Sequence, residues 1–425
     1  RELKRDNNVQ IMPSISRVPG VLMQTGALNT NRLTVRGIGA RTPFGTSKIR
    51  AYVNNIPLTT GDGSTTIEDI DLDIIQRVEV LKGPTSSIYG AGLGGTVLLD
   101  ASSPVNPTSG VRSEMIAGSF GLIKSNTEGE IVDDGLNLGI GYNYLYSDGY
   151  RENNRYDRRS FVTAGSINKQ NTTISFLVNF LDLMAFIPSS IDSATFAENP
   201  REAAFTWAQS QGFEDYRKGL LGVALRHNFS DHFIADVSFF QSTYDSYELR
   251  PFNILTENTQ AFGTRALFSF VALSDVVKNI TIGTEYFNDN YKWQTYENDN
   301  RQIGSALIDN KENRDYLNLF IQTNLQVSPK LRLDAGLNFN TTAYSLEDRF
   351  VADSVDQSGN YSFENILSPR VSLLYSANTQ NNFYATISHG FSPPSLPETL
   401  TPDGLINPDI QPEKGWNYEI GYKGY

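Results

Sequence analysis

Apolar and polar residues alternate over long stretches of the chain after residue 110. In residues 136–147, Leu, Ile and Tyr occupy every second position, and Asn, Gly and Ser occupy most positions between them. The same period of two recurs at 233–239, 316–325 and 331–340. Because successive side chains of an extended strand point to opposite faces, this period predicts β-strands with one apolar face.

Short polar turns separate these strands at one end, and long connections separate them at the other. The turns lie at 133–134, 169–171, 230–232, 277–279, 328–330 and 377–382, and the long connections at 148–157, 184–215, 245–262, 288–313, 342–363 and 392–415. We expect about 13 strands of about 10–15 residues, which is the organisation of an outer-membrane β-barrel.

A soluble all-β sandwich or propeller is the alternative. The length of the strands and the polar face opposite the apolar one argue against it, since that polar face suits a water-filled lumen. Aromatic residues also gather near strand ends, where a membrane-interface girdle would lie: Tyr142, Tyr144, Tyr146, Phe239, Phe240 and Tyr244.

Residues 1–103 follow a different pattern, typical of a small α+β domain. Strands are predicted at 32–36, 50–53, 77–81 and 96–99, and a short helix near 67–75, where acidic residues fall in the first turn. Pro104, Pro107 and Gly110 mark the boundary with the alternating half.

A glycine-rich loop at 83–95 follows the third of these strands. Such a loop can cradle phosphate, but no Gly-Lys-Ser/Thr closes this one, and a β-type run rather than a helix follows Gly95. The glycines are better explained as turn residues with positive φ and close backbone neighbours.

Composition narrows the function classes. The 425 residues carry a net charge of −12 and include no cysteine. We therefore expect no nucleic-acid partner, no thiol chemistry and no disulfide framework. No apolar run approaches the roughly 20 residues of a membrane helix, a length that a β-barrel does not need.

Several motifs in the first half occur in a characteristic order and spacing. They are LTVRGIG at 33–39, AYVNNIPL at 51–58, IIQRVEVLKGP at 74–84 and SIYG…GG at 87–95. Together they resemble the plug domain of TonB-dependent outer-membrane receptors. The segments 388–394 and 407–421 resemble parts of the barrel of the same family.

The resemblance implies a mainly β protein of the bacterial outer membrane, in which an N-terminal α+β plug fills a transmembrane antiparallel β-barrel. The plug would comprise residues 1–108, and residues 109–425 would form the N-terminal part of the barrel. Family barrels have 22 strands, so roughly nine strands are expected beyond Tyr425. The segment that binds the inner-membrane protein TonB is not visible before Arg1.

The resemblance also implies active, TonB-driven import across the outer membrane, whose lipid surrounds the barrel. Residues 186–212 resemble a loop of ferric-siderophore receptors, and the absence of histidine from 395–406 disfavours haem. We expect a ferric siderophore or similar iron chelate as substrate and no cofactor, because the iron travels within the chelate. Alternatives are import of a glycan, cobalamin or another metal chelate, and a non-transport surface or sensor protein. No enzymatic motif is found.

Two sets of functional residues follow from the resemblance. Hydrogen-bond donors, positive charge and aromatic surface suit an anionic chelate, and the expected substrate contacts are Arg41, Phe44, Thr60 and Tyr89. In the family, plug arginines pair with barrel glutamates and hold the plug in place. The corresponding residues here are Arg36, Arg77 and Glu419. The alternatives are solvated loop residues for the first set and ordinary ion pairs, worth under about 1 kcal/mol, for the second.

Overall fold

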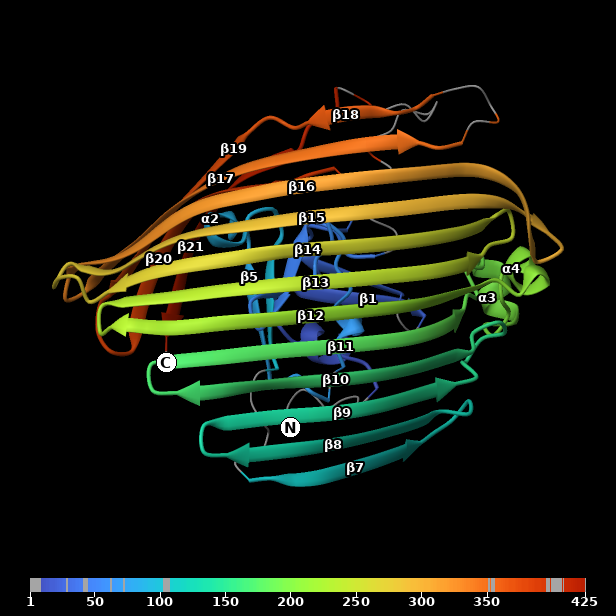
Figure 1. Ribbon diagram of the computed structural model, residues 1–425, viewed down its shortest axis with the longest axis horizontal. Coiled ribbons are helices and arrows are strands. Elements are labelled where there is room, and N and C mark those ends of the chain that lie inside the picture. Colours follow the sequence, from blue (N-terminus) through green and yellow to red (C-terminus); the bar gives the residue numbers. More distant parts are fainter. Residues whose placement is uncertain are drawn as a thin grey trace.

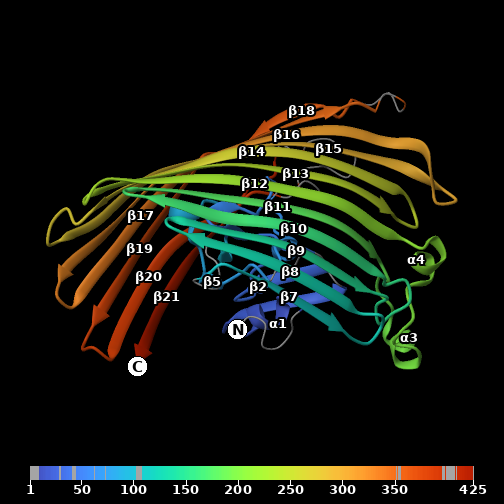
Figure 2. The ribbon, with the colours of Figure 1, turned by 60° about the horizontal axis from the view of Figure 1, so that its bottom comes forward.

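The computed structural model describes residues 9–27, 30–40, 45–61, 63–71, 73–101, 108–350, 352, 356–394, 398, 407 and 409–424. Arg41 and Phe44, two of the expected substrate contacts, lie outside the described residues. The described part of residues 9–101 is here called the plug. A large curved sheet, built from residues after 110, wraps around it (Figure 1 and Figure 2).

The large sheet is antiparallel and has 15 described strands. Chain neighbours pair in order from β7 to β21, except that β19 pairs β17 and the short β18 pairs only β17. The strands are β7 (Gly110–Ala117), β8 (Ile123–Asp133), β9 (Leu136–Ser147), β10 (Tyr156–Lys169), β11 (Thr172–Phe186), β12 (Phe213–Ser230), β13 (Phe233–Leu249), β14 (Ile254–Val271), β15 (Val277–Asp299), β16 (Gln302–Ser328), β17 (Leu331–Asp348), β18 (Gly359–Ser362), β19 (Ile366–Ser376), β20 (Asn381–Ser392) and β21 (Glu413–Gly424).

The expected end-to-end asymmetry is confirmed, but the long connections expected at 245–262 and 288–313 are wrong. Those residues are mainly strand, and only residues 250–253 and 300–301 join β13 to β14 and β15 to β16. Short turns join the strands at one end, and the long connections, including α3 (Ser193–Glu198) and α4 (Phe205–Ser210), lie at the other (Figure 1). By analogy with outer-membrane barrels, we call the long-loop end extracellular. Strands reach 27 residues in β16, longer than the alternation suggested, because the β15–β16 hairpin continues as a ribbon through polar sequence.

One face of the sheet is apolar and exposed, and the other covers the plug. On β12, Leu221, Val223 and Leu225 are exposed, whereas the lumen-facing Tyr216 and Leu220 are buried. Exposed apolar side chains on alternate positions of strand after strand form the surface that a bilayer covers. The predicted aromatic girdle is wrong for Tyr244, whose ring packs on the lumen-facing Tyr216. It is also wrong for Phe240, which is 4% exposed and packs inward on Phe287. It neighbours Phe239 in an extended strand, so the two rings point to opposite faces.

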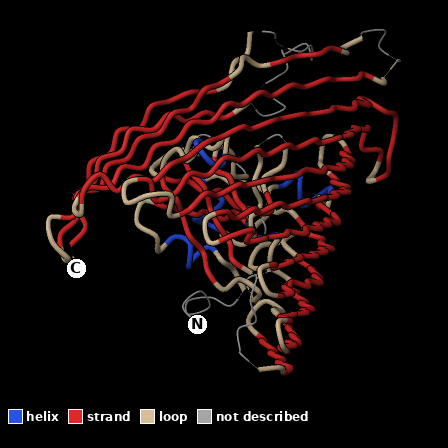
Figure 3. The backbone as a smooth tube through the Cα atoms, turned by 60° about the vertical axis from the view of Figure 1, so that its left-hand side comes forward, coloured by secondary structure: helices blue, strands red, loops and turns tan. Residues whose placement is uncertain are grey.

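The plug contains a four-stranded sheet, a two-stranded sheet and short helices. Its elements are α1 (Met12–Ser16), β1 (Val21–Ala27), β2 (Thr30–Val35), β3 (Ile49–Val53), β4 (Ile56–Pro57), the 3-10 helix η1 (Ile67–Asp69), β5 (Arg77–Lys82), α2 (Ser86–Tyr89) and β6 (Gly95–Asp100). The four-stranded order is β4-β3-β6-β5, with β3 and β6 parallel. The tube in Figure 3 shows these elements on the concave side of the strands.

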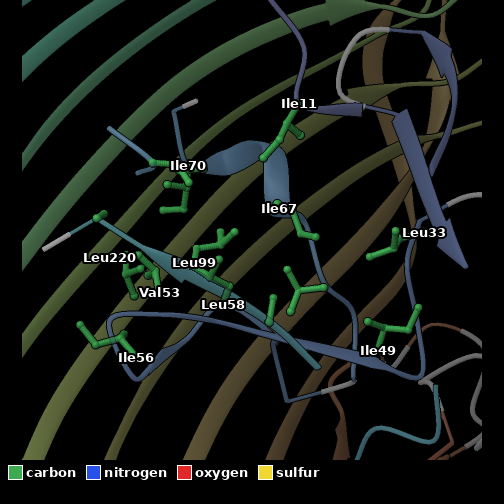
Figure 4. Packing of buried hydrophobic residues seen from close by; sticks show 14 of the residues in the cluster. Ile11, Leu33, Ile49, Val53, Ile56, Leu58, Ile67, Ile70, Leu99 and Leu220 are labelled. Atoms are coloured by element: carbon green, nitrogen blue, oxygen red, sulfur yellow. The ribbon is translucent and has the colours of Figure 1, made fainter. Parts of the chain in front are cut away.

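The plug core consists of aliphatic residues from every part of the domain. Val53, Ile56, Leu58 and Leu99 meet in Figure 4, and Leu220 of β12 joins them from the barrel wall. Contact is close there because Gly222 of β12 has no side chain. A Cβ at that position would lie 2.0 Å from Cδ1 of Ile56.

The glycine-rich loop contains a feature that the sequence pattern did not reveal. Residues 86–89 form the short helix α2 between two glycine turns. Gly83, Gly90 and Gly95 have positive φ, and a Cβ on Gly95 would lie 2.2 Å from the carbonyl oxygen of Leu81. The interpretation of the glycines as turn residues with close backbone neighbours is confirmed.

Candidate functional site

A short acidic stretch of the plug, residues 68–73, lies against the barrel wall and is here called the acidic segment. The predicted helix over 67–75 is wrong beyond Asp69, since η1 ends there and an irregular chain follows. Asp69, Asp71 and Asp73 are each at most 4% exposed. The three aspartates contact barrel side chains, while Ile70 packs in the plug core.

Five consecutive barrel strands supply partners to the acidic segment. Asp73 contacts Lys124 of β8 and Asn143 of β9, with Nζ–Oδ2 and Nδ2–Oδ2 distances of 2.7 and 2.8 Å. The Oγ of Ser160 on β10 donates to Asp71, at 3.0 Å. Further bonds come from Arg158 to the carbonyl of Glu68, from Asn179 to the carbonyl of Asp69, and from Tyr216 and Lys218 to the Asp69 carboxylate.

Glu68 differs from the three aspartates because its carboxyl points into a buried region near Arg158. Burial raises its pKa to about 8, and the neighbouring Asp69 adds to the shift, against a lowering effect of Arg158. One oxygen of Glu68 has no hydrogen-bond partner in the described structure. At neutral pH this carboxyl is therefore largely protonated.

A second plug–barrel contact centres on a carboxylate of β15. Glu285 is 0% exposed and accepts from two guanidiniums, Arg50 of plug strand β3 at 3.3 Å and Arg265 of β14 at 2.6 Å. The hydroxyls of Tyr52 and Tyr316 also donate to it, at 3.1 and 2.7 Å. We call these five residues the Glu285 cluster. Burial raises the pKa of Tyr52, so its hydroxyl stays protonated and continues to donate.

The Glu285 cluster is buried on all sides. The side chains of Arg50, Arg265 and Glu285 are 6%, 2% and 0% exposed. Removing one partner of a buried ion pair leaves an uncompensated charge and costs about 3–5 kcal/mol. Because one carboxylate here serves two cations, it holds β3 of the plug to β14 and β15 of the barrel.

The two arginines expected to hold the plug have different surroundings. Arg36 makes a bidentate contact with Glu419 of β21, at 2.7 and 2.9 Å, and Tyr384 donates to the same carboxylate. Its side chain is 37% exposed, so solvent screens the pair more than it screens the Glu285 cluster. The latch role of this contact stays a prediction.

Among the described residues Arg77 pairs with no barrel glutamate, and its role in holding the plug stays a prediction. Arg77 contacts Glu79 of its own strand at 2.6 Å, and the two side chains are 69% and 43% exposed. It begins β5, an edge strand of the plug sheet, and residues two apart in a strand share a face. The carboxylate within reach is therefore the local one.

The two expected substrate contacts that the structure describes occupy different levels of the lumen. Thr60 lies in the turn after β4, where its Oγ1 donates to the carbonyl of Ser64 and the next residue, Gly61, donates to Asp289 of β15. Tyr89 lies deeper, 5.1 Å from the ring of Tyr52 and 5.2 Å from the guanidinium of Arg265. Burial raises the pKa of Tyr89. Their roles as substrate contacts stay predictions.

The loop that resembles one in siderophore receptors, residues 186–212, is compactly folded at the extracellular end. Arg151 donates to the carbonyls of Ser189 and Glu202, at 2.5 and 2.7 Å. Asn153 donates to the carbonyls of Ile187 and Gly212, at 2.8 and 3.0 Å. These bonds tie the loop to the connection between β9 and β10, so α3 and α4 form a defined surface (Figure 1).

The lumen wall above the plug is polar and aromatic. On β15 and β16, Arg314 contacts Glu312 and lies over the ring of Tyr291, with 5.1 Å to the centroid. On β14, Glu257 accepts from Ser246 and Tyr291. Among the described residues, no group of three or more His, Asp or Glu side chains has an arrangement that could hold a metal ion. The described helices include none that is long and apolar enough to cross a bilayer.

Comparison with known families agrees with this arrangement. Residues 1–97 match the TonB-dependent receptor plug domain, and residues 121–425 match the TonB-dependent receptor-like β-barrel. The chain belongs to the TonB-dependent receptors. The receptor is thus a protein of the bacterial outer membrane, with a plug and a barrel of antiparallel strands, and it is not an enzyme.

Individual relatives are distant in sequence. The receptor is 23% identical to the vitamin B12 transporter BtuB of Vibrio vulnificus (strain CMCP6), over 100% of this chain and 63% of that protein. Its fold is similar to that of the ferric citrate transporter FecA, with a TM-score of 0.81, 14% identity and coverage of 97% of this chain and 64% of that one. It is also similar to that of the siderophore receptor PiuA from Acinetobacter baumannii, with a TM-score of 0.75, 14% identity and coverage of 96% of this chain and 66% of that one. The chain spans slightly under two thirds of each relative.

Sequence reasoning missed the residues that hold the receptor's plug most deeply. Arg50 and Glu285 are 235 positions apart, and each looks like one more polar residue on a strand. One signal was present. Asp69, Asp71 and Asp73 alternate with apolar residues, which indicates an extended chain with one carboxylate face rather than a helix.

Proposed function

We propose that the receptor takes part in TonB-driven uptake of a ferric siderophore or similar iron chelate across the outer membrane. The observation that carries this proposal is the folded plug inside the curved sheet, fixed to it by buried charges at the Glu285 cluster and the acidic segment. A passive pore needs no such occupant. A plug held by several costly contacts requires work to displace it, and that work is what an energised partner supplies.

Two observations favour an iron chelate as the substrate. The loop at 186–212 resembles that of ferric-siderophore receptors, and here it is a folded surface at the extracellular end. Solved structures with a similar fold include transporters and receptors described as acting on ferric citrate and siderophores. A chelate brings its metal already coordinated, so a wall of hydrogen-bonding and aromatic groups suffices to bind it.

Cobalamin is the second candidate. It is favoured by the vitamin B12 transporter that matches the whole of this chain at 23% identity. Import of either substrate would use the same plug, barrel and coupling to TonB. The two proposals differ only in what the extracellular surface and the upper lumen bind.

A titration of intrinsic tryptophan fluorescence tests the substrate class. The receptor at its natural length, in outer-membrane vesicles, is titrated with ferric hydroxamate, ferric catecholate and ferric citrate complexes, cobalamin and oligosaccharides. We expect saturable quenching at sub-micromolar concentration by at least one ferric chelate, and weaker binding of the metal-free chelator. A response to cobalamin or an oligosaccharide alone would contradict the assignment to iron.

A further inference from the structure

A group of side chains at the extracellular end of the lumen has an unbalanced charge. It comprises Glu214 of β12, Tyr244 of β13, Glu257 of β14, Tyr291 and Trp293 of β15 and Asn310 of β16, and is here called the rim site. Registers place Glu257, Trp293 and Asn310 opposite one another across three neighbouring strands. Neighbouring strands are about 4.8 Å apart, so the three form a row about 10 Å long.

The cations near this wall already have carboxylate partners. Lys218 contacts Asp69 of the plug, Arg250 contacts Glu248, and Arg314 contacts Glu312. Glu214 and Glu257 form no salt bridge within the described part of the chain, and Arg250, which is paired with Glu248, is the one cation that interacts with them electrostatically there, so three carboxylates face one guanidinium. Glu214 also lies directly opposite Glu248 in the β12–β13 register, and like charges in that position repel.

Hydroxyl groups orient the two remaining carboxylates. Tyr244 donates to Glu214 at 3.3 Å, and Ser246 and Tyr291 donate to Glu257. These bonds fix the oxygens without neutralising their charge. Glu214, Glu257 and Trp293 are only partly buried.

Asn310 is an independent sign that the rim site lacks a partner. It is 1% exposed, it faces the lumen with Glu312 and Arg314, and its side-chain oxygen has no hydrogen-bond partner in the described structure. A buried polar group without a partner is costly, and natural structures seldom keep one without a function. This oxygen calls for a donor, which is also what the two carboxylates require.

We propose that the rim site binds a protonated amine of the substrate. The carboxylates of Glu214 and Glu257 accept hydrogen bonds from the ammonium group, and the oxygen of Asn310 accepts one more. The rings of Tyr244, Tyr291 and Trp293 supply faces that attract a cation. This inference rests on the proposed uptake of a chelate, and it narrows the substrate to chelates that carry a free amine.

A pair of chelates that differ only in charge tests the proposal. One is a linear ferric trihydroxamate with a terminal primary amine, and the other is the same complex acetylated on that amine. The receptor at natural length, in outer-membrane vesicles, should bind the amine form at least about tenfold more tightly, since a charge-assisted hydrogen bond is lost on acetylation. In Glu257→Gln and Glu214→Gln that preference should shrink to about twofold or less.

The control variant is Glu347→Gln, which removes an exposed carboxylate of β17 and should keep the full preference. Equal binding of the two chelates by the unaltered receptor would overturn the proposal, as would a preference that survives both rim substitutions. If neither chelate binds, pentane-1,5-diamine decides the matter. It should change the fluorescence emission of Trp293 in the unaltered receptor but not in the Glu257→Gln variant. If the emission changes in neither protein, the rim site is overturned. The proposed function fails separately, if no ferric chelate of the wider panel binds.

Discussion

Neutralising Glu285 is the perturbation whose effect the structure determines most closely. In Glu285→Gln, the guanidiniums of Arg50 and Arg265 remain in a region where the native carboxylate is 0% exposed. Breaking one buried ion pair costs about 3–5 kcal/mol, and here two cations lose one counterion. We therefore expect opening of the plug to become easier by at least about 3 kcal/mol, which corresponds to more than about 100-fold in the opening equilibrium.

Thiol labelling can measure this opening because the chain contains no cysteine. Ala51 of β3 is 0% exposed, so a cysteine in Ala51→Cys reacts with an external reagent only when the plug opens. Labelling is followed against urea concentration in the receptor at natural length, in vesicles. When reclosing is faster than labelling, the rate is proportional to the opening equilibrium.

Two control variants make the test specific. Glu347→Gln removes an exposed carboxylate of β17 and should change opening by less than about 0.5 kcal/mol. The double variant Arg265→Gln with Glu285→Gln should be destabilised by less than the sum of the two single changes. Arg265→Gln removes one of the two guanidiniums that Glu285→Gln leaves without a counterion. Equal labelling in Glu285→Gln and Glu347→Gln would refute the anchoring role of the cluster.

Four further predictions concern other charged residues of the plug and use the same labelling assay. Arg36→Ala should ease opening by only about 1 kcal/mol, since the pair of Arg36 with Glu419 is partly exposed. Arg77→Ala should leave opening and uptake unchanged, because Arg77 pairs with Glu79 of its own strand. A measurable effect of Arg77→Ala would contradict this local pairing. Asp71→Asn should ease opening by about 1–3 kcal/mol, because its charge-assisted hydrogen bonds with Ser160 and the Asp73 amide are weakened. Asp133→Asn, at the exposed end of β8, should be neutral, and equal effects of the two changes would argue against the acidic segment as an anchor. Glu68 has a pKa of about 8 in the folded plug and near 4.5 when unfolded, so its contribution to stability is complete below pH 4.5 and is lost as pH rises through 8. The free energy of plug opening should therefore fall as pH rises over this range, and Glu68→Gln should flatten this pH dependence. Labelling rates are normalised to those of an exposed cysteine, and an unchanged pH dependence in Glu68→Gln would show that another group titrates.

Local patterns in the sequence were sufficient for the architecture. Apolar and polar residues alternate over residues 136–147 and 331–340 because each strand has one face toward lipid and one toward the lumen. Short turns at one end of the strands and longer loops at the other are typical of outer-membrane barrels. The plug strands at 49–53, 77–82 and 95–100 could also be placed to within one or two residues, because glycine turns delimit them.

The plug–barrel contacts could not be predicted, because they depend on register between distant segments. Whether Arg50 meets Glu285 or another lumen residue depends on how deeply the plug sits and on which residue of β15 faces inward. The Arg36–Glu419 contact was anticipated from the resemblance alone. The helix was predicted too long in the acidic segment because acidic residues in a first turn are a helix signal, whereas only the 3-10 helix over Ile67–Asp69 forms.

We propose that the folded plug, held by buried charges, must be displaced for an iron chelate to pass. Uptake of radioactive iron into cells, as the chelate that binds best in the fluorescence panel, tests this most directly when measured with and without functional TonB. We expect uptake that requires TonB, with binding to the receptor unchanged in its absence. Equal uptake in cells lacking TonB would contradict it.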